Sequence, residues 1–156
     1  PRTKLRFIKI GDIFCYQFLE KTFVFGQILG KVNVGHVIQF FDIFQASPTI
    51  TVEELNRAQF IGKPIIVDSY TLFDRSPVWS WQIIAHQADF DPSPFKDLAF
   101  KWGDPNGLQF GKVWLDGRTE PKIFSREEVE DLDWEACVGS IVYNRILEEK
   151  LDKQMK

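Results

Sequence analysis

The sequence predicts an α+β protein, built on a strongly bent, barrel-like antiparallel β-sheet with a short internal helix and C-terminal helices. Three observations support this prediction. The 156 residues include 15 Phe, 5 Trp and 3 Tyr, and aromatic residues are enriched in strands. Two apolar runs, residues 11–18 and 22–29, flank a polar break, which is typical of a β-hairpin. Near the C-terminus, apolar residues recur at helical spacing.

The first half of the chain is expected to consist mainly of strands. Residues 36–44 follow the hairpin as a third strand, and residues 64–68 form a strand whose continuous apolar run indicates that both faces are covered. A short helix is expected between them, because Thr51 and Glu54 have capping-box spacing, in which each side chain accepts from the other residue's backbone N–H.

The second half is expected to add shorter strands and then helices. Four strands are predicted at residues 78–86, 98–102, 110–115 and 121–124. Ser125 and Glu128 again have capping-box spacing. A longer helix is predicted from Trp134 onward, with one buried stripe formed by Trp134, Cys137, Val138, Ile141, Val142 and Ile146. No repeat or linker interrupts the chain, so residues 1–156 are expected to form one domain.

Composition and charge exclude several functional classes. A hydrophobic content of 44% and a charged content of 26% are ordinary for a soluble globular protein. The net charge of −3 argues against a general nucleic-acid-binding protein, and it leaves open a basic protein partner. No signal-peptide pattern and no long apolar run are present, so we expect a cytoplasmic protein without a membrane partner.

Motifs for catalysis or metal binding are sparse. His36 and His86 lie in separate predicted strands, and they could form a metal site or a Cys–His pair with Asp68 or Cys15. Strand histidines that are partly buried and hydrogen-bonded are the more common arrangement, and we favour it. Cys15 and Cys137 are expected to be small buried hydrophobes rather than a disulfide. We therefore expect no enzyme activity, no cofactor and no bound metal.

Two tryptophans suggest an alternative function. Trp79 and Trp81 lie on the same face of their predicted strand, because strand side chains alternate. Such a pair could hold a methylated lysine or stack on a base. The alternative is therefore a barrel-type module that reads a peptide or single-stranded nucleic acid. Large aromatic residues more often supply core area, and we favour core packing.

The densest charge feature is an acidic run near the C-terminus. It consists of Glu127, Glu128, Glu130, Asp131, Asp133 and Glu135. These residues could pair with Lys and Arg of a partner, or they could simply occupy the first turns of helices, where carboxylates are favoured. The helical explanation accounts for the later acids only if a second helix begins near Asp133, so both explanations stay open.

A second candidate surface is the loop of residues 89–97, DFDPSPFKD. It places Asp89, Asp91 and Asp97 beside Phe90 and Phe95, which look exposed in the sequence. Aromatic anchors on a loop stiffened by proline suit a recognition surface. The alternative is an ordinary connection with one Phe tucked underneath.

The N-terminal pattern resembles a known family. Residues 9–30, KIGDIFCYQFLEKTFVFGQILG, followed by HVIQFFDIF at residues 36–44, resemble the Imm26 family of bacterial immunity proteins. The positions that carry the resemblance are Gly11, Asp12, Phe14, Phe25, Gly26, Gln27, Leu29 and Gly30. Residues 77–86, PVWSWQIIAH, are also similar to a Trp-containing strand of that family.

The resemblance implies an inhibitor without catalytic residues. Such proteins bind and neutralise a cognate toxin domain that is delivered between competing bacteria by contact-dependent inhibition or other polymorphic toxin systems. Given the acidic charge, we expect a stoichiometric complex with a C-terminal toxin domain that is a basic nuclease, and no direct contact with nucleic acid. The expected interface consists of Asp89, Phe90, Asp91, Phe95, Glu128, Glu130, Asp131 and Asp133.

Overall fold

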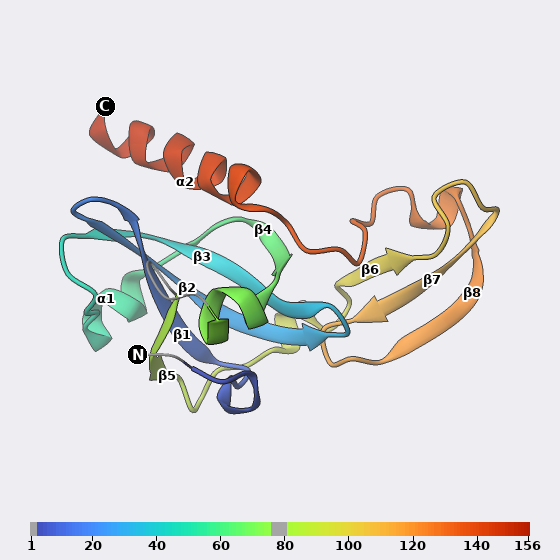
Figure 1. The fold of residues 1–156 in the computed structure, drawn as a ribbon, viewed down its shortest axis with the longest axis horizontal. Helices are drawn as coiled ribbons and strands as arrows, with labels where there is room; N and C mark the ends of the chain where they lie inside the picture. Colours follow the sequence, from blue (N-terminus) through green and yellow to red (C-terminus); the bar gives the residue numbers. More distant parts are fainter. Residues whose placement is uncertain (1–2, 76–80) are drawn as a thin grey trace.

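Two antiparallel sheets organise the computed structural model, which describes residues 3–75 and 81–156 (Figure 1). The large sheet contains β1 (Asp12–Leu19), β2 (Thr22–Val32), β3 (Gly35–Gln45), β4 (Phe60–Val67) and β5 (Gln82–His86). Its strand order is β4-β3-β2-β1-β5, so the sheet is curved but open, with β4 and β5 at its edges. The small sheet contains β6 (Ala99–Trp102), β7 (Gln109–Trp114) and β8 (Thr119–Ser125) in that order. The predicted α+β class is confirmed.

The helical segments are α1 (Val52–Arg57), α2 (Ser140–Met155), the π-helical segment η2 (Tyr70–Arg75) and the short 3₁₀ turns η1 (Leu5–Phe7), η3 (Ser93–Phe95) and η4 (Glu127–Val129). The capping box of α1 is confirmed: the Glu54 N–H donates to Thr51 Oγ1 at 3.1 Å, and the Thr51 N–H donates to Glu54 Oε2 at 2.9 Å. The Ser125–Glu128 pair forms similar bonds, but it opens only the short turn η4. None of the described helices is long and apolar enough to cross a membrane.

The C-terminal helix begins later than predicted. It starts at Ser140 rather than Trp134, because the backbone before it is used for pairing with strands. Trp134 forms a parallel bridge with Lys101 of β6, and the Val138 N–H donates to the Ile66 carbonyl of β4 at 2.7 Å. The predicted apolar stripe is therefore wrong in part: Ile141 is 77% exposed. The buried residues of α2 are Tyr143 and Leu147.

Both faces of the large sheet are covered. On one face, a core that includes Phe14, Tyr16 and Trp81 packs against Tyr143 and Leu147 of α2. The opposite face carries two clusters. One contains Ile13, Cys15, Phe25 and Phe41, with Leu55 of α1 packed against it, and the other contains Leu29, Val32, Val37, Ile66, Phe100, Val113 and Leu115. The second cluster mixes residues of both sheets, so the small sheet is seated on the large one.

Residues of the N-terminal hairpin that carry the family resemblance have packing roles. Phe14 lies opposite Gly26, and a Cβ at position 26 would approach the Phe14 ring to 2.4 Å, so glycine lets the ring pack against the backbone. Gln27 is buried, and its Nε2 donates to Gln87 Oε1 at 2.7 Å and to the Gly11 carbonyl at 3.3 Å. The bond to Gln87 holds the segment just before the 89–97 loop next to the large sheet.

Candidate partner-binding site

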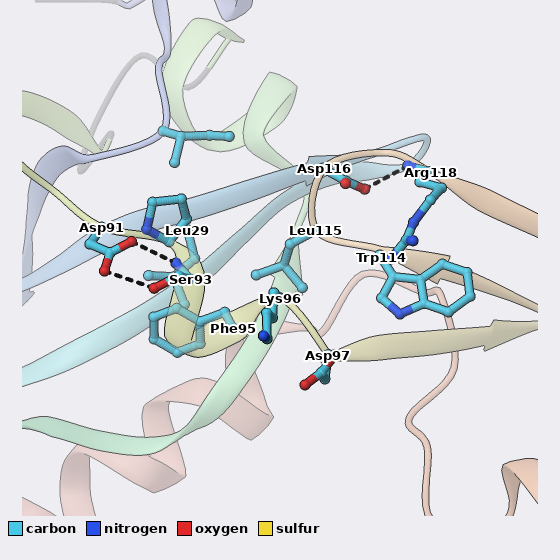
Figure 2. Close-up of a pocket in the computed structure, with 12 residues that line it drawn as sticks. Leu29, Asp91, Ser93, Phe95, Lys96, Asp97, Trp114, Leu115, Asp116 and Arg118 are labelled. Atoms are coloured by element: carbon cyan, nitrogen blue, oxygen red, sulfur yellow. Dashed lines mark hydrogen bonds between the residues drawn. The ribbon is translucent and has the colours of Figure 1, made fainter.

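A cleft of about 540 Å³ opens where the two sheets meet (Figure 2). One wall is the 89–97 loop, and the other is the β7–β8 turn, residues 115–118 with Trp114 before it. Leu29 of β2 and Leu115, the first residue of that turn, form the floor of the cleft, and both are buried core residues. The cleft thus has an apolar floor that belongs to the core shared by the two sheets.

The loop wall is held by its own hydrogen bonds. Asp91 Oδ1 accepts from the Ser93 N–H at 2.9 Å, and Asp91 Oδ2 accepts from the Ser93 hydroxyl at 2.7 Å. These bonds lower the pKa of Asp91 below its usual value, so the carboxylate is ionised at neutral pH. The Phe95 N–H donates to the Pro92 carbonyl at 2.9 Å within the turn η3. The loop therefore presents a fixed shape.

The aromatic residues of this loop are less exposed than predicted. Phe90 and Phe95 are half-buried, and both pack against the cluster that joins the two sheets. Phe95 also meets the Phe60 ring edge to face, at a centroid distance of 6.0 Å. Burial of these rings removes apolar area from water, which fixes the loop onto the sheet. Phe95 still lines the cleft.

The β7–β8 turn is equally well defined. Gly117 has φ of 84°, and its N–H donates to the Trp114 carbonyl at 3.0 Å. Asp116 Oδ1 accepts from the Arg118 N–H at 2.9 Å. The Arg118 guanidinium lies 4.4 Å from the centre of the Trp114 ring, a cation–π contact. These residues connect the strands predicted at 110–115 and 121–124, and nothing in the sequence marked them as part of a site.

The cleft has an excess of carboxylates. Asp91, Asp97 and Asp116 are exposed at its rim, together with the cations Lys96 and Arg118. Within the described residues, none of the three carboxylates lies within 4.0 Å of a cationic nitrogen.

The acidic segment, defined as residues 126–135, forms a separate surface. Glu128, Glu130, Asp131 and Asp133 are all exposed. Asp133 pairs with Lys63 at 2.9 Å, with both side chains about half exposed or more, so this ion pair contributes little to stability. No helix begins at Asp133, because its carbonyl accepts from the Lys101 N–H of β6 at 2.9 Å. A helical first turn therefore does not explain the later acids.

The predicted interface residues do not form one patch. The turn η4, which carries Glu128, lies at the end of the small sheet that points away from the large sheet (Figure 1). The β7–β8 turn, which forms one wall of the cleft, lies at the opposite end of the small sheet (Figure 1), and Asp91 and Phe95 line the other wall. Asp89 and Phe90 precede the cleft in the 89–97 loop and do not line it. The structure thus separates a cleft from an acidic segment.

The histidines each have a partner of their own. His36 Nδ1 lies 2.6 Å from Ser69 Oγ, and burial lowers the pKa of His36 to about 4. His86 Nδ1 lies 2.7 Å from Oδ1 of the buried Asp12. The prediction of hydrogen-bonded strand histidines is confirmed. Over residues 3–75 and 81–156, no three His, Cys, Asp or Glu side chains gather in a group that could hold a metal ion.

The cysteines differ from each other. Cys15 is buried as predicted, and burial raises the pKa of its thiol to about 11, which disfavours the reactive thiolate. Cys137 is exposed, so the prediction that it is buried is wrong. It lies in the extended segment before α2, and its Sγ is 3.2 Å from the Val34 carbonyl. Both cysteines are free thiols.

Trp81 does not form part of an open binding surface. Trp81 is only 2% exposed, and it stacks on Phe14 and Tyr16 at centroid distances of 4.8 and 4.7 Å. Core packing, which the sequence favoured, is confirmed for Trp81. Trp79 lies outside the described residues. A reader that depends on Trp81 would have to expose the centre of this core, so we set that alternative aside.

Comparison with models of known protein families shows which family the chain belongs to. The family model described as Immunity protein 26, or Imm26, matches residues 9–111 of the chain. The chain belongs to the Imm26 family. Searches of curated proteins and of solved structures give no significant match. The resemblance seen in the N-terminal hairpin is thereby confirmed.

The Imm26 match includes part of the candidate surfaces and leaves the rest outside. It covers the strands of the large sheet, the 89–97 loop and the start of the small sheet, and it ends at Gly111 within β7. The second wall of the cleft, residues 114–118, lies beyond the match, and so does the acidic segment. Asp12 and Gln27, which carry the Imm26 resemblance, are buried and hydrogen-bonded. These two residues therefore stabilise the scaffold rather than face a partner.

Proposed function

We propose that this Imm26 protein acts in the cytoplasm by binding a cognate C-terminal toxin domain in a stoichiometric complex, and that the toxin is a basic nuclease. Membership of the family implies an immunity protein. The observation that carries the finer proposal is the charge of the acidic segment. It holds six carboxylates and one cation, whereas the net charge of the whole chain is only −3. Four of these carboxylates, those of Glu128, Glu130, Asp131 and Asp133, are exposed.

The proposed action needs no catalytic residue. Nucleases hold their substrate largely through Lys and Arg contacts to phosphates. Carboxylates placed against these cations occupy the positions of the phosphates, and they also speed the encounter by long-range attraction. The attraction is screened by salt, so the rate of association should fall as ionic strength rises.

Co-expression tests this function directly. The chain is expressed with the C-terminal domain encoded by the gene immediately upstream, and growth and co-purification are measured. Rescue of growth together with a complex of fixed ratio supports the proposal, and degradation of nucleic acid by the free domain identifies a nuclease. A toxic domain that stays toxic and forms no complex would contradict it.

Charge reversal tests the acidic segment. The triple variant Glu130→Lys, Asp131→Lys, Asp133→Lys is compared with a matched control on the exposed side of α2: Glu148→Lys, Glu149→Lys, Asp152→Lys. Both variants change the charge equally, so a difference between them reports the location of the surface. We expect a loss of affinity of at least about tenfold for the first variant only. Equal affinities would place the interface elsewhere.

A further inference from the structure

We propose that the cleft between the 89–97 loop and the β7–β8 turn receives a loop of the toxin domain, which inserts an apolar side chain flanked by Lys or Arg. The proposal rests on the proposed function and adds the chemistry that the immunity protein recognises. The cleft is distinct from the acidic segment: the turn η4 of that segment lies at the other end of the small sheet (Figure 1), and its Asp133 pairs with Lys63 of β4.

The size and lining of the cleft indicate an apolar anchor. Its volume of about 540 Å³ falls in the range of protein sites that enclose ligands, and it exceeds what a single side chain fills. Leu29 and Leu115 form the floor, and Phe95 and Trp114 stand on opposite walls (Figure 2). Anchors at the centre of interfaces are typically aromatic or large aliphatic side chains in such desolvated pockets.

The carboxylates at the rim of the cleft indicate that the partner carries cations beside its apolar anchor. The carboxylates of Asp91, Asp97 and Asp116 have no cationic partner within 4.0 Å among the described residues. The rim also carries the cations Lys96 and Arg118, the second stacked on Trp114 at 4.4 Å, so the carboxylates exceed the cations by one. A partner loop with Lys or Arg next to the anchor would pair with these carboxylates, whereas an acidic loop would be repelled.

Both walls are ordered before a partner arrives. The Asp91–Ser93 bonds and the turn η3 fix the loop wall, and the Asp116–Arg118 bond fixes the other. The Lys31 N–H donates to the Leu115 carbonyl at 3.0 Å and holds the turn against the large sheet. A preformed cleft avoids the entropic cost of ordering its walls during binding.

A second apolar groove is a weaker candidate. It has a volume of about 260 Å³ and lies between β4, the segment before α2, and α2 itself. The charged residues that line it are Lys63 and Asp133, which already pair with each other at 2.9 Å. This groove therefore offers a partner no unpaired charge, and the larger cleft does.

Two variants test the cleft against the same upstream-encoded toxin domain. Asp97→Asn with Asp116→Asn removes two charges and keeps a side-chain acceptor for the Arg118 N–H. Lys96→Trp fills the cleft from its exposed rim. The matched control is Glu148→Gln with Glu149→Gln on α2, and thermal unfolding verifies that every variant is folded. We expect the affinity to fall about tenfold in the first variant and more in the second, with the control unchanged.

The outcomes separate this proposal from the proposed function. Neutralisation by the wild-type chain with unchanged affinity in both cleft variants would overturn the cleft proposal alone. A wild-type chain that neither binds nor neutralises the toxin domain would overturn the proposed function. In that case the cleft is tested on the chain itself, by NMR titration with the tripeptide acetyl-Lys-Trp-Lys-amide and its acidic counterpart acetyl-Glu-Trp-Glu-amide. Shifts of the Trp114 indole and Leu115 methyl signals by the basic peptide alone support the cleft chemistry, and equal or absent shifts overturn it.

Discussion

Leu115 of the β7–β8 turn sits directly on Gly30 of β2, and this contact joins the two sheets. A Cβ at position 30 would lie 2.5 Å from the Leu115 carbonyl oxygen and 2.7 Å from its Cβ. The same carbonyl accepts the Lys31 N–H at 3.0 Å. Only glycine leaves space for this approach, so a residue in the N-terminal hairpin sets the position of one wall of the cleft.

The first prediction concerns this junction. Gly30→Ala should force Leu115 away from β2 and lower the free energy of unfolding by about 1–3 kcal/mol, because the clash is with backbone and cannot be relieved by a side-chain rotation. Urea unfolding measures the change. Gly139→Ala is the matched control, since nothing lies within 4 Å of a Cβ at that position. A Gly30→Ala protein as stable as the control would show that the junction is not as tight as described.

The second prediction concerns the aromatic core. Trp81→Ala should lower the free energy of unfolding by about 3–5 kcal/mol, because it empties the space between Phe14, Tyr16 and Tyr143. Trp134→Ala, at a residue that is 36% exposed, should cost less. Chemical denaturation followed by circular dichroism compares the two. A smaller loss for Trp81→Ala than for Trp134→Ala would contradict the assignment of Trp81 to the core.

The third prediction concerns stability at acid pH. Burial, with a smaller contribution from Lys31, lowers the pKa of His36 from 6.5 to about 4. Between these values the unfolded chain binds a proton that the folded protein excludes. The free energy of unfolding is therefore highest above about pH 6.5, and it falls on acidification. From pH 8 to pH 5 this one group should remove about 2 kcal/mol. Urea unfolding at several pH values measures the slope.

A His36→Asn variant provides the control for this slope. Its free energy of unfolding should be lower at neutral pH, because the hydrogen bond to Ser69 and the packing change. Its dependence on pH between about 6.5 and 4 should be flatter than that of the wild type, by about one proton. Identical slopes in the two proteins would assign the acid sensitivity to another group.

The fourth prediction concerns Glu135 at the edge of the small sheet. Burial raises the pKa of this carboxyl group, although the Asn33 N–H donates to it, and Oε2 has no hydrogen-bond partner among the described residues. The ionised form is therefore disfavoured by folding, so the carboxylate costs stability at neutral pH and costs none once it is protonated in both states. Glu135→Gln should raise the melting temperature at pH 7, and the gain should shrink toward acid pH. A gain that is independent of pH would indicate a packing effect instead.

Local patterns predicted the parts of the fold that depend on near neighbours. The β1–β2 hairpin, the capping box of Thr51 and Glu54, and the burial of Trp81 follow from alternation, spacing and side-chain type. Each depends on residues a few positions apart, so the sequence carries the whole signal. The Imm26 resemblance rested on this same hairpin, which lies within the matched residues.

Elsewhere, contacts between residues far apart in the sequence determined the conformation or the burial, and local patterns did not. Trp134 to Val138 have helical spacing, yet they are extended because their backbone groups bond to Lys101 and Ile66. Phe90 and Phe95 look exposed in an acidic loop, yet they are half-buried because the small sheet brings a second apolar surface to them. Neither result is visible in a window of ten residues.

The sequence by itself determined the antiparallel α+β class, the family and the charge of the candidate surfaces, because these depend on composition and on local periodicity. The tertiary structure alone decided how those surfaces are arranged. It brought residues 91–97 and 114–118 together into a cleft and placed the turn η4 of the acidic segment at the far end of the small sheet. The physical reason is that the seating of Leu115 on Gly30 joins positions 85 residues apart, and no local propensity encodes such a contact.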